Sequence, residues 1–198
     1  MADNFCNVYL ALIHFPVYNK NEEIISTSVT NLDIHDIARL ARTYGIRQYF
    51  IVHPAPKQQQ LVQSVLDFWR LGYGASYNPD RSQALQLITI ADSLLDVTER
   101  IEAAEGMRPI IVSTGAKSSS SSVSYPALRH QIANSRRPFL LLFGTGWGLP
   151  ASIMAESTFI VEPIYGVSEF NHLAVRSAAA IILDRLLGSN WWDGSLSC

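Results

Sequence analysis

The stretch from Pro138 to Pro150 constrains the fold more than any other part of the chain. It begins with an apolar run from Phe139 to Phe143 and ends in Gly144-Thr-Gly-Trp-Gly-Leu-Pro, where three glycines stand at alternate positions. A short apolar run closed by turn residues predicts a strand that is buried on both faces of a parallel sheet. Because glycine leaves adjacent peptide groups uncovered, the following loop is expected to expose main-chain N–H and C=O groups.

Strand-like apolar runs alternate with helix-like segments along the chain. The strand-like runs lie at residues 7–14, 48–53, 108–114, 138–143 and 158–164, and the helix-like segments at 33–44, 58–71, 81–105, 126–134 and 171–187. Residues 72–80 are rich in turn formers, and Gly45 and Gly106 end the first and third helices. The alternation predicts an α/β fold, with a parallel sheet and helices on both of its faces.

The length of 198 residues and the hydrophobic content of 48% suit one well-buried domain, expected over residues 1–190 with a tail over 191–198. Cys6 and Cys198 form no metal or disulfide pattern, which favours a reducing cytoplasm. The chain shows no signal peptide and no apolar run of about 18 residues, so export and membrane insertion are not expected.

The formal net charge of −2 weighs against a dedicated nucleic-acid-binding module. Any contact with nucleic acid must then come from a local patch or from a partner protein. The candidates are Lys117, Arg129, Arg136 and Arg137, beside a serine run at 118–122 that is expected to be flexible and solvated.

Three familiar glycine motifs do not fit. Residues 144–149 carry leucine where the third glycine of a dinucleotide fingerprint belongs, and residues 115–118 place an alanine between the glycine and lysine of a phosphate loop. Residues 166–170 end in phenylalanine where a nucleophile elbow needs glycine. The five histidines show no metal-ligand spacing, so no metal is expected.

What remains is a glycine-containing loop after each of three successive strands, which end at Thr114, Phe143 and Ile164. Open α/β sheets bind small ligands in the crevice beyond the carboxyl ends of their strands. A neutral or zwitterionic nucleoside suits such loops, because main-chain groups can hold it. The alternative is that these glycines only form tight turns, and the residues alone leave both readings open.

Three segments carry a resemblance to a known family. They are Gly144-Thr-Gly-Trp-Gly-Leu149, Val161-Glu-Pro-Ile164 and Asn171-His-Leu-Ala-Val-Arg-Ser-Ala-Ala-Ala-Ile181. Together they resemble the C-terminal region of the SPOUT superfamily of RNA methyltransferases, especially the small bacterial SAM-dependent family related to the tRNA (guanine-N1) enzymes. Residues 31–39 are similar to the superfamily's first motif. The resemblance implies a C-terminal deep trefoil knot, S-adenosylmethionine as cofactor, a tRNA or rRNA substrate, and a homodimer formed through the C-terminal helix and knot.

The resemblance also implies the residues that hold the cofactor, mainly through their main chain. The first loop supplies Thr114 and Gly115, the second Phe143, Gly144, Gly146, Trp147, Gly148 and Leu149, and the third Ile164, Tyr165, Gly166, Asn171, His172 and Leu173.

Four residues are candidates for catalysis. Arg39 stands six residues before Gly45 and so resembles the superfamily arginine that faces substrate or phosphate; its alternative role is a solvated or ion-paired helix residue. Methyl transfer to a ring nitrogen needs in-line positioning and a proton acceptor, for which Glu169 and His172 are candidates, and Arg176 is a second orienting cation. Glu169 can instead complement a helix start, and Arg176 can instead pair with a carboxylate of a second subunit.

The ribose-methylating branch of the superfamily ends in Leu-Asn-Val-Ser, whereas this chain has Leu173-Ala-Val-Arg176. The difference favours a base over the ribose as the methyl acceptor. Two other interpretations stay open: a catalytically silent SAM-, nucleotide- or protein-binding module with the same fold, and a flavodoxin-like domain that binds a phosphate-bearing cofactor.

Overall fold

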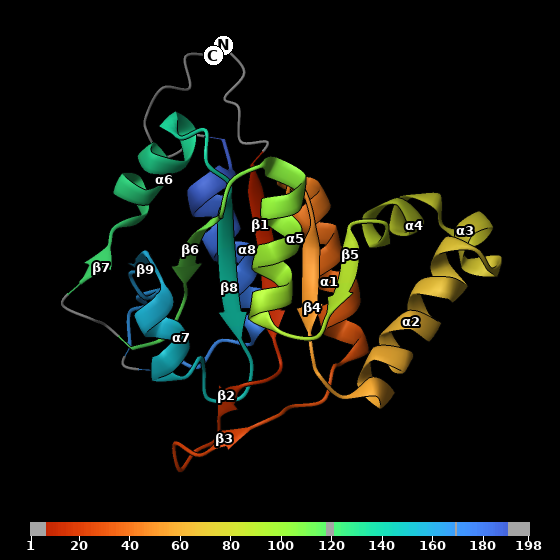
Figure 1. Cartoon of the computed structure of the whole chain (residues 1–198), viewed down its shortest axis with the longest axis horizontal. Helices are drawn as coiled ribbons and strands as arrows, with labels where there is room; N and C mark the ends of the chain where they lie inside the picture. The colour runs from red at the N-terminus through yellow and green to blue at the C-terminus, as the bar shows by residue number, and fades with distance from the viewer. Residues whose placement is uncertain (1–6, 118–120, 169, 190–198) are drawn as a thin grey trace.

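Seven parallel strands form the central sheet. The computed structural model describes residues 7–117, 121–168 and 170–189. The strands of this sheet are β1 (Val8–Ile13), β4 (Tyr49–Val52), β5 (Ile88–Ala91), β6 (Ile110–Ser113), β7 (Ser122–Val123), β8 (Phe139–Gly144) and β9 (Phe159–Val161). Their order is β5-β4-β1-β8-β6-β9-β7, so β1 and β8 lie side by side in the middle (Figure 1). Leu10 of β1 stands opposite Leu141 of β8 and Tyr49 of β4, which fixes the register at the centre.

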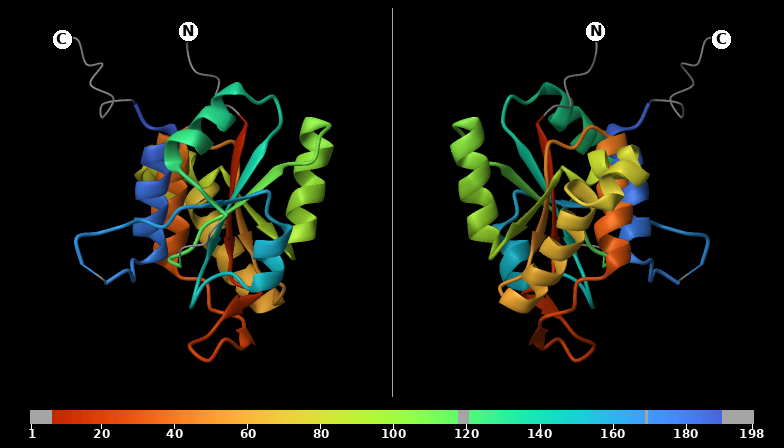
Figure 2. Two further views of the ribbon diagram at one scale, coloured as in Figure 1. Left: turned by 90° about the vertical axis from the view of Figure 1, so that its left-hand side faces the viewer. Right: turned by 90° about the vertical axis from the view of Figure 1, so that its right-hand side faces the viewer.

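Helices cover both faces of this sheet, as expected (Figure 2). They are α1 (Asn31–Thr43), α2 (Pro56–Arg70), α3 (Tyr73–Tyr77), α4 (Pro79–Leu85), α5 (Leu94–Glu105), α6 (Tyr125–Asn134), α7 (Ala151–Glu156) and α8 (Val175–Leu187). Leu10 and Leu12 of β1 pack in one core with α1, α2, α4, α6 and α8, whereas Tyr9 and Ile13 pack in a second core with α5 and α7. Successive side chains of a strand point to opposite faces, so β1 supplies both cores.

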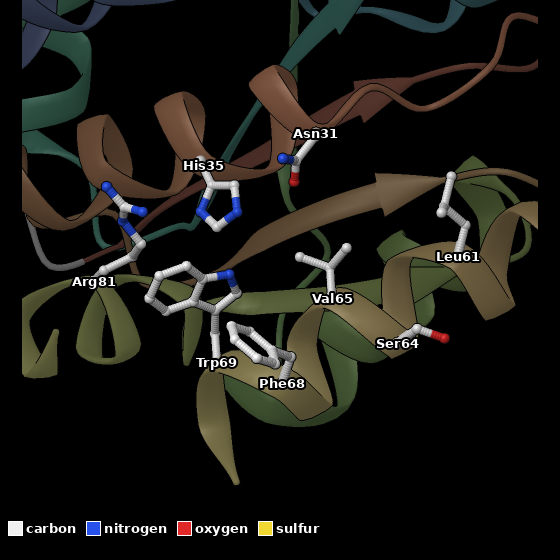
Figure 3. Close-up of a pocket in the computed structure, with 8 residues that line it drawn as sticks. All are labelled: Asn31, His35, Leu61, Ser64, Val65, Phe68, Trp69 and Arg81. Carbon is white, nitrogen blue, oxygen red and sulfur yellow. The ribbon is translucent and has the colours of Figure 1, made fainter. Parts of the chain in front are cut away.

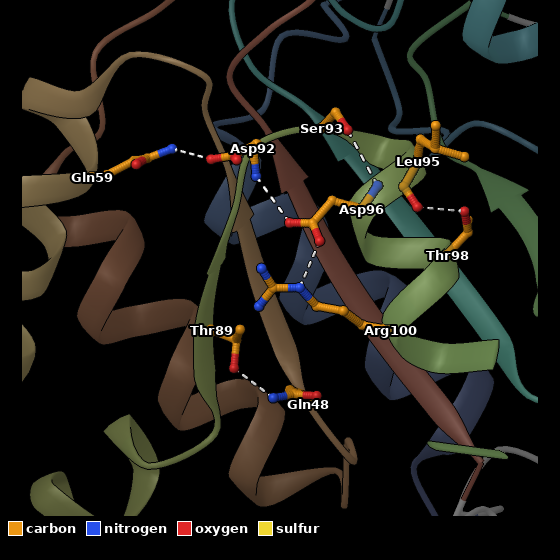
Figure 4. Close-up of polar contacts among 9 residues, drawn as sticks. All are labelled: Gln48, Gln59, Thr89, Asp92, Ser93, Leu95, Asp96, Thr98 and Arg100. Atoms are coloured by element: carbon orange, nitrogen blue, oxygen red, sulfur yellow. Dashed lines mark hydrogen bonds and ion pairs between the residues drawn. The ribbon is translucent and has the colours of Figure 1, made fainter. Parts of the chain in front are cut away.

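Residues 81–105, expected to form one helix, instead contain the end of α4, strand β5 and helix α5. Strand β5 pairs with β4 in parallel, and the Gln48 amide donates to the Thr89 hydroxyl at 2.5 Å across this pair (Figure 4). The prediction was wrong because Leu85, Ile88 and Ala91 fit helical spacing as well as they fit a short buried strand.

The start of α5 is marked by its capping residues. The Ser93 hydroxyl accepts from the Asp96 N–H at 3.2 Å, and the Asp96 carboxylate accepts from the Asp92 N–H, also at 3.2 Å (Figure 4). Asp96 further pairs with Arg100 one turn later at 2.7 Å. A serine followed three residues later by an acidic residue is a helix-start signal, so the sequence did contain evidence for this boundary.

Other expected elements differ in smaller ways. The turn-rich segment 72–80 holds α3 and the start of α4, and the helix expected over 171–187 begins at Val175. Helix α7, strand β7 and a two-stranded hairpin of β2 (Val17–Tyr18) and β3 (Ile24–Ile25) were not anticipated. The remaining expected strands and helices are confirmed, and Gly45 and Gly106 take positive φ angles of 68° and 71° after their helices.

Within the described ranges, no helix is both long and apolar enough to cross a bilayer. The proposed tail at 191–198, Glu169 and most of the serine run lie outside the described residues.

Candidate functional site

Three loops meet beyond the carboxyl ends of β6, β8 and β9, because these neighbouring strands run in parallel. We call them loop 1 (114–117), loop 2 (145–150) and loop 3 (162–174). Loop 3 contacts both of the others: the Asn171 amide donates to the Ala116 carbonyl at 2.9 Å, and the rings of His172 and Trp147 lie 6.3 Å apart. The structure therefore brings together the three segments predicted to hold the cofactor.

Loop 2 has its shape because of its glycines. A Cβ at Gly144 would lie 2.8 Å from the Leu149 nitrogen, so the loop can fold back on the strand end only if residue 144 lacks a side chain. Gly146 has a φ of 59° and Gly148 a φ of 104°, both in the region that favours glycine.

The β2–β3 hairpin holds loop 2 from one side. The Trp147 N–H donates to the Tyr18 carbonyl at 2.8 Å, and the Tyr18 N–H donates to the Gly148 carbonyl at 3.0 Å. A Cβ at Gly146 would come within 2.8 Å of the same Tyr18 carbonyl. The hairpin thus fixes one edge of loop 2, and no sequence pattern had indicated this contact between residues far apart in the chain.

Buried and partly buried polar side chains extend this support below loop 2. The Thr145 hydroxyl lies 2.5 Å from the Thr27 hydroxyl, which lies 2.9 Å from the His14 Nδ1 atom. His14 is 0% exposed and stacks on His53 with ring centroids 6.1 Å apart. Burial, and then the nearby His53, lower the pKa of His14 to about 4, so its imidazole is neutral at physiological pH. Burial also lowers the pKa of His53.

The predicted cofactor residues divide into two groups by exposure. The side chains of Thr114, Phe143 and Leu149 are buried, and the Thr114 hydroxyl donates to the Leu142 carbonyl at 2.9 Å, so these residues could contact a ligand only through their main chain. Ile164 is partly buried and packs against the core. The exposed group around loops 2 and 3 comprises Trp147, Tyr165, His172 and Leu173.

The three loops also have open peptide faces. A Cβ built at Gly115, Gly148 or Gly166 would meet no atom within 4 Å, and these glycines lie in loops 1, 2 and 3 respectively. Two of these glycines, Gly148 and Gly166, directly follow the exposed aromatic residues Trp147 and Tyr165 in the sequence. Bare peptide groups next to aromatic surface fit the adenosine and amino-acid parts of S-adenosylmethionine, so the residues present suit that group.

The catalytic candidates fall in two places. Arg39 of α1 and Arg176 of α8 line one cleft of about 430 Å³, together with Asp36. The Arg176 guanidinium lies 3.6 Å from the Asp36 carboxylate, an ion pair within the chain, and Arg39 is exposed. His172 instead lies in loop 3, with its ring 5.3 Å from that of Phe170. The fourth candidate, Glu169, lies outside the described residues.

The structure does not form one basic patch from all four candidates, Lys117, Arg129, Arg136 and Arg137. Lys117 follows the carboxyl end of β6, whereas Arg136 and Arg137 precede the amino end of the parallel strand β8. Arg129 donates to the Gly188 carbonyl at 2.8 Å, and Lys117 lies 3.4 Å from the Glu22 carboxylate. Lys117 and the Arg136–Arg137 pair therefore lie at opposite ends of the parallel strands, which proximity to the serine run in sequence does not reveal. Among the described residues, no group of three or more potential ligands is placed to hold a metal ion.

Comparison with known proteins shows the family of this chain and agrees with its fold. Residues 7–188 match the profile of a family described as SAM-dependent RNA methyltransferases, and the chain belongs to this family. It is 44% identical over 187 residues to an uncharacterized protein of Aquifex aeolicus, which covers 94% of this chain and 91% of that protein. It is 40% identical over 182 residues to a protein of Oleidesulfovibrio alaskensis named tRNA (guanine-N(1)-)-methyltransferase, covering 92% of this chain but only 42% of the relative.

Solved structures share the architecture at low sequence identity. A TrmH/SpoU tRNA modifying enzyme of A. aeolicus superposes with a TM-score of 0.53 at 18% identity, covering 96% of this chain and 78% of that one. The SpoU methyltransferase AviRb of Streptomyces viridochromogenes, solved with AdoMet, gives 0.52 at 17% identity, covering 91% and 56%. The α/β fold expected from the sequence is confirmed as one shared with SPOUT methyltransferases, and the family dependence on S-adenosylmethionine is confirmed with it.

Proposed function

We propose that the chain transfers the methyl group of S-adenosylmethionine to a base of tRNA or rRNA, with loops 1, 2 and 3 holding the cofactor. The observation that carries this proposal is the convergence of the three glycine-containing loops, joined by the contact of Asn171 with Ala116 and of His172 with Trp147. Guanine N1 of a tRNA is the first acceptor to test. That activity is the printed name of a longer relative, and this chain spans only 42% of that relative's length.

The cofactor would be held mainly by peptide groups of Thr114, Gly115, Phe143, Gly144, Gly146, Gly148 and Leu149, with Ile164, Tyr165, Gly166, Asn171 and Leu173 from loop 3 and the ring of Trp147. Bound there, it supplies an electrophilic methyl group on a sulfonium. A base supplied by the chain would take up the proton that the acceptor nitrogen loses.

The chain's own residues would position the acceptor and move that proton. His172 lies in loop 3 and contacts Trp147 of loop 2, so it is the described residue best placed to accept a proton near the cofactor, with Glu169 as the second candidate. Arg39 and Arg176 share a cleft and would orient RNA phosphate or stabilise developing negative charge on the base. Positioning of the acceptor in line would supply most of the rate.

We also propose that the C-terminal part of the chain is threaded as a deep trefoil knot. Strand β9 lies between β6 and β7, and residues 114–117, which begin the connection to β7, leave the carboxyl end of β6 next to the carboxyl end of β9. The chain that leaves β9 must pass this connection to reach α8, and Asn171 contacts it at Ala116. Passage of loop 3 through the connection would give the knot.

The proposed unit is a cytoplasmic homodimer of single domains over residues 1–190. Helix α8 buries Ala179, Ile182 and Leu183 against its own subunit, whereas Ile181 is only partly buried and lies outside the described core clusters. Loop 3 exposes Val167 and Phe170, with 74% of Phe170 accessible. A second copy packed on α8 and loop 3 would cover these apolar side chains.

The test compares two glycine variants. A Cβ at Gly144 would lie 2.8 Å from backbone, so Gly144→Ala should distort loop 2 and weaken S-adenosylmethionine binding about tenfold or more. Gly106→Ala is the control, because Gly106 follows α5 outside the three loops and its Cβ would meet no atom within 4 Å, so binding should stay within about twofold of wild type. Calorimetry measures binding, and transfer of labelled methyl into total RNA followed by nucleoside analysis measures activity. Binding without transfer would leave a catalytically silent module; equal binding by both variants would contradict the placement of the cofactor.

A further inference from the structure

A second cleft lies on the other side of α1 from the Arg39–Arg176 cleft. We call it the α1–α2 groove; it has a volume of about 380 Å³ and lies between α1, α2 and α4. Figure 3 shows Trp69 at its centre, with His35 pointing down to it from α1, Arg81 beside it and Phe68 below. Asn31 of α1 and Val65 of α2 also line the groove. The volume falls within the range of small-molecule sites.

The groove combines aromatic surface with an unpaired cation. The Arg81 guanidinium lies 4.7 Å from the centroid of the Trp69 ring, and the Phe68 ring packs edge-on against Trp69 at 5.4 Å. Phe68 is 48% exposed although it is a large aromatic residue. No carboxylate of the described chain lies within ion-pairing distance of Arg81, so the groove carries a positive charge that a ligand can neutralise.

Two polar atoms of the groove lack partners. His35 Nδ1 and Arg81 Nε are shielded from water and make no hydrogen bond within the described chain. Unpaired buried polar atoms are costly, and these two have almost no accessible surface, so an occupant of the groove would bond to the other nitrogens of the guanidinium and the imidazole. Burial and the charge of Arg81 lower the pKa of His35, so its neutral ring offers one donor and one acceptor.

We propose that the α1–α2 groove binds an unpaired nucleotide of the substrate RNA, with the base against Phe68, its polar edge at His35 and Arg81, and its phosphate near the guanidinium. Stacking on aromatic rings and Arg contacts are the means by which proteins hold single-stranded RNA. The inference rests on the proposed action on RNA. It places a contact with the substrate outside the loops that hold the cofactor.

Binding of a fluorescein-labelled 12-nucleotide single-stranded RNA of mixed sequence, followed by fluorescence polarisation, tests the groove. Loss of one stacking contact predicts about tenfold weaker binding by Phe68→Ala. Tyr77→Ala is the matched control, because Tyr77 is an aromatic residue that is 68% exposed and does not line the groove. Arg81→Gln should lower the slope of log affinity against log salt by about one.

Several results would overturn the inference: wild-type affinity in Phe68→Ala, an equal loss in Tyr77→Ala, or displacement of the RNA by AMP at similar concentrations, which would mark a free-nucleotide site. Photo-crosslinking of the wild-type protein to an RNA that contains 4-thiouridine gives a second readout that needs no variant. The crosslinked residue should lie in α2 or α4. Calorimetry with S-adenosylmethionine separates the two proposals. Normal cofactor binding together with wild-type RNA affinity in Phe68→Ala would contradict the proposed RNA contact in the groove alone. Absence of cofactor binding would contradict the proposed function, while weaker RNA binding by Phe68→Ala would still support the groove.

Discussion

His14 should make the protein sensitive to mild acid. Its ring is 0% exposed, and burial together with His53 lowers its pKa from 6.5 to about 4. The folded state therefore keeps His14 neutral, while the unfolded chain takes up a proton once the pH falls below about 6.5. Stability is present above that pH and is lost as the pH falls towards 4. The full difference is worth about 3 kcal/mol, since one pKa unit corresponds to about 1.4 kcal/mol, and about 2 kcal/mol of it is lost by pH 5.

Urea unfolding at about pH 7.5 and about pH 5 measures this contribution for wild type and for His14→Asn. Asparagine keeps a polar group near Thr27 but does not titrate, so the variant should lose about 2 kcal/mol less than wild type between the two pH values. His130→Gln is the control, because His130 is exposed on α6, and it should lose as much as wild type. An equal loss in wild type and His14→Asn would refute the assigned role of His14.

Three further outcomes are expected. Arg39→Ala and Arg176→Ala should each lower methyl transfer about tenfold or more with unchanged affinity for S-adenosylmethionine, and unchanged turnover in a transfer assay would remove both from the catalytic list. Ile181→Asp should convert the dimer to monomer in sedimentation experiments, whereas Ile24→Asp on the exposed β3 strand should not; a dimer in both would contradict contact through α8. Gly146→Ala should cost about 1–3 kcal/mol in urea unfolding, because its φ is 59° and its Cβ would meet the Tyr18 carbonyl, and a neutral effect would mean that the hairpin yields.

The sequence revealed those elements whose burial leaves a continuous pattern. Strands β1, β4 and β8 are buried at nearly every position, so they appear as uninterrupted apolar runs. Strand β5 has only four residues, and both periodicities fit it; β7 and β3 have two residues each and leave no pattern. In such cases the capping residue Ser93 is a better guide than hydrophobic periodicity.

The candidate site was predictable only in part, for a related reason. Glycines at strand ends mark loops 1, 2 and 3, because a tight turn and an open peptide face are local requirements. The support that His14, Thr27 and Tyr18 give to loop 2 is not local. These residues stand more than a hundred positions before Thr145 and Trp147 in the sequence, and no sequence spacing indicates the contacts between them. The predicted basic patch shows the opposite problem. Lys117 and Arg136 flank the same segment of the sequence, yet they lie at opposite ends of the parallel strands β6 and β8.

Helix α1 connects the two clefts proposed to contact RNA. His35 lines the α1–α2 groove, and Arg39, one turn later, lines the cleft shared with Arg176. One helical turn advances about 5.4 Å, so a single strand that crosses α1 can reach both clefts with nucleotides close together in its sequence. The positive charge of Arg39 also helps to lower the pKa of His35, which shows that the two side chains share one electrostatic environment. An RNA phosphate bound near Arg39 would offset that charge, so occupation of one cleft would change the electrostatic environment of the other.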